Sequence, residues 1–363
     1  MNKIQPGIVL LTMIMISAMI TADCGQCARS QRKPSAPPSV ARLVQNEKYD
    51  IKLSPYALSP LTVCEAIRKT TQVAHTTKDD IAPHNKEQRN FLDKQYLLYV
   101  KNNLLNLFSP DELQSYASRN ADELNAILQR KGFSLQFPPL KRNQIGVLAI
   151  QDVLVKWLLQ GTKEPLSVGE SMYDGVILKD EIVPEGSKKG ERTLQFFAQN
   201  PSSTVIVKLL TKSNDVVYFV TKRDGQLFKQ KPTEEAISQA IMHYSSEVKK
   251  GTSALVNDRF TGVHFPMISY NVNPDISWLV HMRIGTTSIA QAMQQVIFKM
   301  NEEGARAKAA AALIVATSFL GENPKERLVI DKPFLVWIER PGVVLPIFAG
   351  YMTQEFWKNP GVL

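Results

Sequence analysis

One segment near the C-terminus limits the possible folds more than any other part of the chain: residues 301–312, in which alanines alternate with charged side chains. Alanine has the highest helix propensity, and Glu302 and Arg306 have the i, i+4 spacing of an ion pair, so a surface helix is one interpretation. Read with the period of two that a β-strand has, the segment becomes two-faced. One face carries Ala305, Ala307, Ala309 and Ala311, and the other carries Arg306 and Lys308. A strand of this kind can slide between two existing strands, with small side chains in the core and charges in water.

The composition is that of an ordinary globular protein. The chain has 363 residues, of which 44% are hydrophobic and 21% are charged, and this excludes a disordered chain, a collagen and a polytopic membrane protein. Because neither a repeat nor a linker interrupts residues 41–363, we expect a single domain there. The 43 basic and 34 acidic residues give a net charge of +9, which weakly favours acidic partners such as heparin-like glycans. The basic residues form no block interleaved with aromatic residues, so nucleic acid is not an expected partner.

The N-terminus has the pattern of a secretory signal peptide. Lys3 provides a positive charge, residues 8–20 are apolar or small, and Ala22 is a small residue at a plausible cleavage point. The apolar stretch is short for a membrane span, and no second stretch approaches about 18 apolar residues, so stable membrane insertion is not expected; a signal anchor is the alternative. We therefore expect residues 1–22 to be removed, residues 23–40 to form a polar, proline-rich lead-in, and the protein to be secreted and extracellular.

The three cysteines give no catalytic pattern. Cys24 and Cys27 form a C-x-x-C pair directly after the expected cleavage site, and Cys64 stands alone. A local disulfide or an intermolecular bond is a better interpretation of the pair than redox catalysis, because the pair lies in a proline-rich terminus and not in a βαβ unit. Three cysteines cannot all pair within one chain, so at least one thiol stays free or bonds to another molecule.

The apolar spacing changes from helical to strand-like along the chain. Up to about residue 160 it predicts helices from Ser59-Pro60 to about residue 78, over residues 94–108 and over residues 147–160. After about residue 170, runs rich in β-branched and aromatic residues predict strands. These runs are residues 194–197, 204–210, 216–221, 265–272, 328–338 and 343–352. Helices followed by strands predict an α+β fold with interleaved sheets.

Motifs for catalysis, cofactor binding and metal binding are missing from the sequence. It has no G-x-S-x-G elbow, phosphate-binding loop, dinucleotide G-x-G-x-x-G or H-E-x-x-H motif. The histidines have no metal-ligand spacing to one another or to the cysteines, so each is interpreted as a surface or hydrogen-bonded structural residue. They are His75, His84, His243, His264 and His281. We therefore expect no enzyme activity, no cofactor and no metal.

The alternating segment and the sequence around it resemble the serpin family. The family hinge reads roughly Glu-Glu-Gly-Thr-Glu-Ala-Ala-Ala-Ala, and residues 302–310 follow it closely. Residues 332–336 look like the Arg/Lys-Pro-Phe strand of the family, and residues 346–350 look like its Pro-Leu-Phe-Met-Gly strand. Weaker similarities lie at residues 50–55, which match the opening of the buried second helix, at residues 265–268, and at residues 150–161, a faint echo of the helix that crosses the main sheet.

The resemblance covers most of residues 40–358 and implies both a fold and a function. The implied fold is a single α+β domain with three β-sheets, about eight or nine helices and an exposed reactive-centre loop at residues 302–327. Serpins are suicide substrates: a protease cleaves this loop, its N-terminal part inserts into the main sheet as a new strand, and the acyl-enzyme is trapped before hydrolysis. The implied hinge residues are Glu302, Glu303, Gly304, Ala305, Ala307, Ala309 and Ala311.

The position of the cleaved bond follows from counting along the loop. Counting from the hinge places the reactive bond between Ser318 and Phe319, whereas counting back from Pro333 places it between Glu322 and Asn323. We prefer the first count, because the sheet fixes the length of the inserted strand. The apolar Phe319 favours an extracellular chymotrypsin- or elastase-like serine protease as the partner.

Several residues depart from the inhibitory pattern of the family. Threonine or serine is usual at the position of Ala305, and the family stretch Asn-Ala-Ile-Tyr-Phe-Lys-Gly-x-Trp is missing between residues 170 and 200. Of the gate residues, Ser54 matches the family, whereas Ala57 and Gln294 replace serine and histidine. One alternative is therefore a non-inhibitory serpin-fold protein that binds a ligand or acts as a protease-cleavable carrier. Another is an unrelated secreted α+β protein with a plain helix at residues 302–316.

Overall fold

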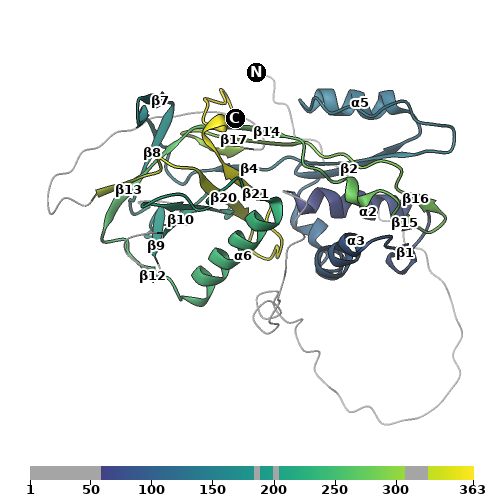
Figure 1. The fold of residues 1–363 in the computed structure, drawn as a ribbon, viewed down its shortest axis with the longest axis horizontal. Coiled ribbons are helices and arrows are strands. Elements are labelled where there is room, and N and C mark those ends of the chain that lie inside the picture. Colours follow the sequence, from purple (N-terminus) through teal and green to yellow (C-terminus); the bar gives the residue numbers. More distant parts are fainter. Residues whose placement is uncertain (1–58, 184–188, 199–203, 307–325) are drawn as a thin grey trace, which may run out of the picture. The chain divides into compact units, whose positions relative to one another are not determined.

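The computed structural model describes residues 59–183, 189–198, 204–306 and 326–363 (Figure 1). Within these ranges the chain forms four α-helical segments, besides short 3₁₀ turns, whereas the resemblance implied about eight or nine helices. The segments are α2 (Pro60–Val73), a continuous run of α3 (Lys86–Phe91), a π-helical turn (Leu92–Tyr96) and α4 (Leu97–Lys101), then α5 (Ala121–Arg130) and α6 (Glu234–Lys250). The expected helix start at Ser59-Pro60 is confirmed, because Pro60 occupies the first turn of α2, where its missing N–H costs nothing.

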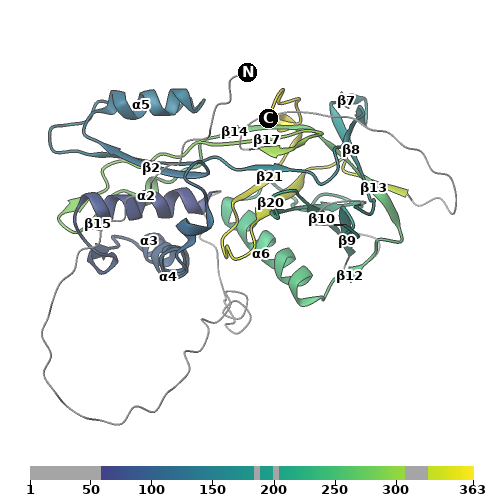
Figure 2. The same cartoon turned by 180° about the vertical axis from the view of Figure 1, so that it is seen from behind.

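The largest sheet has six antiparallel strands, and α6 packs on one of its faces (Figure 2). On that face the rings of Tyr218 and Trp337 stack with centroids 4.8 Å apart, beside Ile237 and Ile241 of α6. The strands expected at residues 194–197, 204–210 and 216–221 are confirmed. In spatial order the sheet contains β12 (Ala254–Leu255), β9 (Leu194–Ala198), β10 (Thr204–Leu210), β11 (Val216–Lys222), β20 (Phe334–Glu339) and β21 (Phe348–Met352).

Two segments that the sequence predicted as single strands are each divided between a second sheet and a neighbouring one. The run at residues 328–338 is divided between β19 and β20, because Pro333 lacks the N–H that a strand interior uses. The run at residues 265–272 is likewise divided, between β13 and β14 (Ile268–Val272). In order, the second sheet contains β19 (Glu326–Val329), β13 (Phe260–Pro266), β8 (Gly175–Lys179) and β5 (Thr162–Lys163), and only β19 and β13 are parallel among its pairs.

A third group of strands contains the first residues of the segment in which alanines alternate with charged side chains. β18 (Gly304–Arg306) lies between β17 (Val296–Met300) and β4 (Leu154–Lys156) and is antiparallel to both. β14 pairs with the other edge of β17, and β2 (Leu113–Ser118) pairs with β3 (Gly146–Gln151), which precedes β4 in the chain. Two smaller sheets contain β1 (Ile81–Ala82), β15 (Arg283–Ile284) and β16 (Thr287–Ser288), and β6 (Leu166–Val168) and β7 (Ser171–Tyr173).

The helix expected over residues 147–160 is wrong, and so is the faint echo of a sheet-crossing helix at residues 150–161. These residues form β3 and β4, and along β3 buried and half-buried residues alternate with the period of a strand. The helix beside these strands is α5, which lies next to β2 in Figure 1. Its Leu124 and Leu128 pack on Leu148 and Ile150 of β3. A short apolar run fits both periods, and here the long-range pairing with β2 selects the strand.

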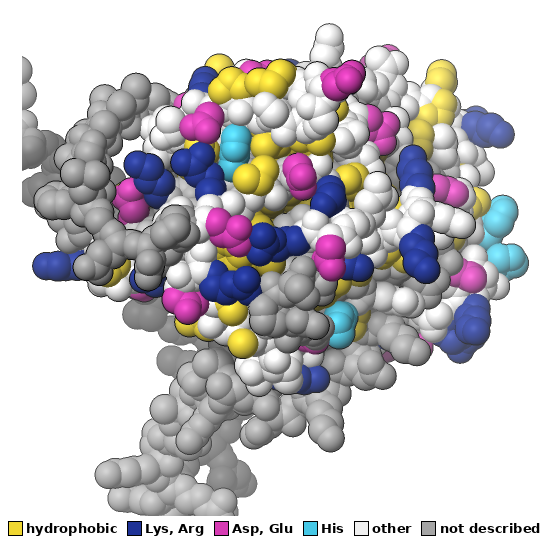
Figure 3. Space-filling model, turned by 60° about the vertical axis from the view of Figure 1, so that its left-hand side comes forward, with side chains coloured by type: hydrophobic (Ala, Val, Ile, Leu, Met, Phe, Trp, Pro, Cys, Tyr) yellow, Lys and Arg dark blue, Asp and Glu magenta, His cyan; other side chains and the backbone are white. Residues whose placement is uncertain are grey.

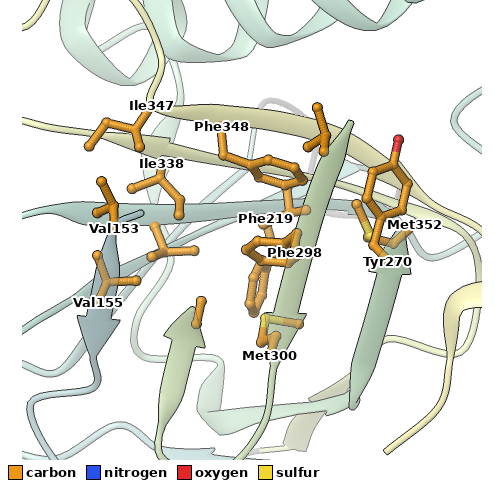
Figure 4. Packing of buried hydrophobic residues seen from close by; sticks show 14 of the residues in the cluster. Val153, Val155, Phe219, Tyr270, Phe298, Met300, Ile338, Ile347, Phe348 and Met352 are labelled. Atoms are coloured by element: carbon orange, nitrogen blue, oxygen red, sulfur yellow. The ribbon is translucent and has the colours of Figure 1, made fainter. Parts of the chain in front are cut away.

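Large apolar side chains fill the space behind β17 and β4. Phe298 of β17 stacks on Phe348 of β21 with ring centroids 4.2 Å apart, and Val153 and Val155 lie in the same cluster (Figure 4). All four are at most 8% exposed. Any residue that enters the sheet between β17 and β4 with its side chain on this side therefore meets a packed core.

A buried carboxylate fastens α2 to its neighbours. Glu65 is 1% exposed, and both of its oxygens accept a hydrogen bond of 2.6 Å from the guanidinium of Arg68. The Tyr99 hydroxyl of α4 donates to Glu65 at 2.7 Å, and the Ser115 hydroxyl of β2 donates at 2.5 Å. The carboxylate therefore links α2, α4 and β2. Local sequence patterns do not reveal the whole cluster, because Tyr99 and Ser115 are far from Glu65 in the chain.

Candidate functional site

A tight turn joins β17 to β18 and contains the first residues that the resemblance assigns to the hinge. The Asn301 backbone N–H donates to the Gly304 carbonyl at 3.0 Å. The Asn301 side chain accepts a hydrogen bond from the Glu303 N–H at 2.9 Å and donates one to the Gly361 carbonyl at 3.2 Å. The turn is therefore fixed both by its own groups and by the C-terminal segment.

The segment that follows β4 holds the same turn from the other side. The Trp157 backbone N–H donates to the Glu303 carbonyl at 3.1 Å, and its indole N–H donates to the Asn301 carbonyl at 3.0 Å. The Gly161 N–H donates to the Glu302 carbonyl at 2.8 Å. Three consecutive carbonyls of the turn thus have donors on one neighbouring segment, which anchors the start of the hinge in the sheet.

Gly304 stands where the backbones of β18 and β4 approach too closely for a side chain. A Cβ atom at this residue would overlap the Val155 carbonyl oxygen and would lie 2.9 Å from Lys156 Cα. Both obstacles are backbone atoms, which cannot turn away as the end of a flexible side chain does. Only glycine fits this position of the hinge motif.

We predict that Gly304→Ala forces β18 away from β4. Overpacking of this kind costs about 1–3 kcal/mol, so the temperature of unfolding falls. Because the Trp157 indole donates to the turn, its fluorescence is expected to change as well, and that change is absent in a Trp157→Phe background. Unchanged fluorescence together with an unchanged unfolding temperature would contradict the close approach of the two strands.

Ala305 follows with its methyl group in the core. It is fully buried, and it pairs with Met300 of β17 and Val155 of β4, which are fully buried too. The strand at Gly304–Arg306 contradicts the plain helix that was the alternative for residues 302–316, over the part that the structure describes. The other alanines of the alternating face, Ala307, Ala309 and Ala311, lie outside the described residues.

Glu302 places a charge at the edge of this turn. Its carboxylate forms an ion pair with the exposed Lys163, with 3.0 Å between Oε1 and Nζ. Its Oε2 atom is buried and accepts no hydrogen bond from any described residue. A buried acceptor without a partner costs free energy, which a rearrangement that exposes Glu302 would recover.

Four polar residues at the start of α2 form what we call the clasp: Ser59, Thr62, Gln151 and Gln294. The Gln294 side chain, just before β17, donates to the Ser59 carbonyl at 3.1 Å and to the Thr62 hydroxyl at 2.9 Å. The Ser59 hydroxyl donates to the side chain of Gln151, the last residue of β3, at 3.2 Å. The clasp therefore ties β3 and the segment entering β17 to the same helix end.

The clasp includes only one of the gate residues that the resemblance assigned. Gln294 is 8% exposed, and its Oε1 accepts no hydrogen bond from any described residue. Ser54 and Ala57 lie outside the described residues, and the partners found for Gln294 are Ser59 and Thr62. The sequence contained a signal for them, because Ser59-Pro60 repeats the Ser54-Pro55 dipeptide, but the second pair was interpreted only as a helix start.

Other predicted features also fall outside the part of the chain that the structure describes. These are the signal peptide at residues 1–22, the lead-in at residues 23–40, Cys24, Cys27, the Ser318-Phe319 bond and the alternative Glu322-Asn323 bond. Cys64 is described: it is fully buried, and burial raises the pKa of its thiol, so it is not a nucleophile at neutral pH. No helix in the described ranges has the length and apolar character needed to cross a membrane.

Comparisons with known proteins give a likeness of structure. No family model matches the chain, and no curated protein matches it. The solved structure of Serpin48, a highly specific serpin of the insect Tenebrio molitor, is 13% identical, covers 81% of this chain and 90% of its own, and has a TM-score of 0.44. Human glycosylated kallistatin is 10% identical, with coverages of 80% and 89% and a TM-score of 0.48. A thyroxine-binding globulin in complex with thyroxine is 11% identical, with coverages of 81% and 91% and a TM-score of 0.46. At such identities, neither an activity nor a ligand is transferred to this chain.

Proposed function

We propose that this chain is a secreted, divergent serpin-fold inhibitor of a chymotrypsin- or elastase-like serine protease and that it acts as a suicide substrate. The observation that carries the proposal is β18: residues that match the family hinge motif already form a strand between β17 and β4. The position supports the interpretation of the alternating alanines as a strand that inserts. The chain itself catalyses nothing in this proposal, because it contributes the scissile bond and the conformational change.

The register of β18 indicates where the following residues would pair in an inserted state. Continuing its pairs along β17 brings Ala307 opposite Phe298 and Ala309 opposite Val296. Continuing them along β4 brings Ala307 beside Val153. These three partners are all buried, so an inserting strand needs small, uncharged side chains at the odd positions.

Within the described ranges, β3 and the first half of β17, between which an inserted strand would lie, each have a strand partner on one side only. In the described ranges, β3 pairs with β2 alone, and Val296–Phe298 of β17 pair only with β14. A strand that extends β18 would form hydrogen bonds to both edges, each contributing about 1 kcal/mol. This gain supports insertion as the favourable direction once cleavage releases the loop.

Inhibition then follows from the order of two chemical steps. The protease serine attacks the Ser318 carbonyl, an ester forms, and the amine of Phe319 leaves with a proton. The N-terminal part of the loop inserts with the protease still attached, and the distorted active site no longer activates water for the second step. The alternative bond between Glu322 and Asn323 would give the same outcome with a longer tether.

Incubation with chymotrypsin, elastase and trypsin tests the proposal. We expect a covalent complex that survives boiling in detergent with one of the first two enzymes, and a released C-terminal peptide that begins at Phe319. A peptide that begins at Asn323 would move the bond but keep the mechanism. Cleavage by every protease without any complex would contradict inhibition.

The clasp and the hinge support one alternative, a non-inhibitory binding protein. The buried Oε1 of Gln294 has no hydrogen-bond partner among the described residues, and Ala305 stands where the family usually has threonine or serine. If cleavage gives no complex, ligand binding becomes the better function. Basic and acidic side chains are interspersed on the face in Figure 3, which argues against a strong site for heparin-like glycans there. Salt-dependent retention on a heparin column tests binding of such glycans.

A further inference from the structure

We propose that His84 and His281 form a surface binding site for a divalent transition-metal ion of the class that prefers imidazole: Zn²⁺, Cu²⁺ or Ni²⁺. The two rings lie edge to face with centroids 5.6 Å apart, and both side chains are exposed. The site is distinct from the hinge and the clasp and does not depend on the proposed inhibition. Spacing along the sequence gave no sign of it, because the two residues are far apart in the chain.

Strand pairing brings the two histidines together. β1 pairs with β15 in antiparallel register, with Ile81 opposite Ile284 and Ala82 opposite Arg283. His84 follows β1 by two residues and His281 precedes β15 by two, so both lie just beyond the same end of this strand pair. Their ring centroids are 5.6 Å apart, close enough for both side chains to reach one ion.

A buried glutamine fixes the backbone on both sides of the site. Gln88 is 0% exposed, and its Oε1 accepts a hydrogen bond of 2.5 Å from the His84 backbone N–H. Its Nε2 donates to the carbonyls of Trp278 and Val280 at 2.7 Å and 2.9 Å. One side chain therefore holds the segment of His84 against the residues that lead into His281, so the pair is preorganised.

The backbone of His281 adds a second sign of function. Its φ is +70°, in the left-handed region that costs energy for a residue with a side chain. The His281 N–H donates to the Ile289 carbonyl at 2.8 Å, which holds this conformation. Strained residues of this kind concentrate at binding sites, where the strain serves to aim a side chain.

The separation of the rings suits a shared ion. With zinc-to-nitrogen distances of about 2.0 Å, each ring centre lies about 3.2 Å from the metal, and two rings at a tetrahedral angle have centres about 5.2 Å apart. The observed 5.6 Å needs little adjustment.

Water would complete the coordination of this ion. No group of three or more histidine, cysteine, aspartate or glutamate side chains that suits a metal occurs among the described residues. Two protein ligands make an open, exchangeable site, unlike the four-ligand sites that hold zinc for structure. Cu²⁺ and Ni²⁺ are expected to bind at least as well as Zn²⁺ if affinity follows the usual order for nitrogen ligands, with Cu²⁺ the tightest.

Calorimetric titration with NiCl₂, ZnCl₂ and CuCl₂ at pH 7.5 tests the site, in a Cys24→Ser, Cys27→Ser background that removes competing thiols. We expect one ion per chain, and an affinity at least tenfold lower in His84→Gln and in His281→Asn. Asparagine tolerates the left-handed backbone, so the second variant keeps the fold. The matched control is His75→Asn, which removes another exposed histidine at a left-handed residue (φ +51°) and is expected to bind as the parent does.

Two further readouts keep the result separate from folding and from inhibition. The metal is expected to raise the temperature of unfolding of the parent and of His75→Asn but not of the two site variants. Without metal, all four proteins are expected to unfold at similar temperatures and to form the same amount of protease complex. Equal affinity in His84→Gln and the parent, or no binding by the parent, would overturn the site and leave the proposed function untouched.

Discussion

Ala305→Arg is expected to convert the protein from an inhibitor into a substrate. Ala305 is fully buried between Met300 and Val155, and an arginine there would bring a charge into a packed core without a partner. Insertion of the strand that begins with β18 would then be blocked at its first core-facing residue. With the target protease, the covalent complex on a denaturing gel should fall at least tenfold, and free cleaved protein should rise to match.

The alternation of the segment provides the control for this variant. Lys308 belongs to the opposite face of the predicted strand, so Lys308→Ala should leave the yield of complex close to that of the parent. Ala305→Ser, which changes size little, should also keep most of it. Unchanged trapping by Ala305→Arg would show that insertion does not begin at β18, and circular dichroism distinguishes this from a variant that fails to fold.

Glu65→Ala is expected to have the largest effect on stability. It leaves the Arg68 guanidinium, the Tyr99 hydroxyl and the Ser115 hydroxyl without their shared acceptor. Removing one partner of a buried ion pair costs about 3–5 kcal/mol. Urea unfolding should therefore show a much lower midpoint, whereas Glu87→Ala on α3 should change the free energy of unfolding by less than about 0.5 kcal/mol. Equal midpoints for the two variants would contradict the structural role of the carboxylate.

The Glu65 carboxylate is expected to make the free energy of unfolding depend on pH. Burial by itself raises the pKa of Glu65, but hydrogen bonds from Arg68, Ser115 and Tyr99 and the charge of Arg68 together lower that pKa below its ordinary value. The lowered pKa stabilises the folded state fully at a pH above the pKa of the unfolded chain, which is about 4.3 for glutamate. This stabilisation is lost as the pH falls through the lower pKa of the folded state. Glu65→Gln should lose this contribution, so its stability should fall less than that of the parent between about pH 5 and pH 3.

Local patterns predicted those parts of the fold that depend on nearby residues. The start of α2 at Pro60, the central strands of the six-stranded sheet and the strand character of residues 304–306 all followed from period, propensity or capping. The alternation beginning at Ala305 also indicated correctly which side of β18 faces the core, because Ala305 is buried. Such a pattern depends only on residues that are close together in the chain, so a single sequence is enough to detect it.

Features that depend on distant partners were missed or misread. Residues 147–160 fit a helix until β2 supplies the pairing that makes them strands. Trp157 holds the hinge turn through two hydrogen bonds, and Ser59 joins Gln151 to Gln294, yet none of these contacts joins neighbours in sequence. Glu65 and the histidine pair are of the same kind. Their chemistry appears only when the topology has brought separate segments together.

Thermal unfolding of the protein before and after cleavage within residues 307–325 tests most directly whether the hinge extends into the sheet. Insertion of about seven residues between two strands would form at least one new hydrogen bond per residue, which adds about 7 kcal/mol or more at about 1 kcal/mol for each bond. For a domain of this size, that gain should raise the temperature of unfolding by about 10 °C or more. The predicted result is such a rise in the parent and its absence in Ala305→Arg. An equal or lower unfolding temperature in the cleaved parent would contradict insertion between β17 and β4.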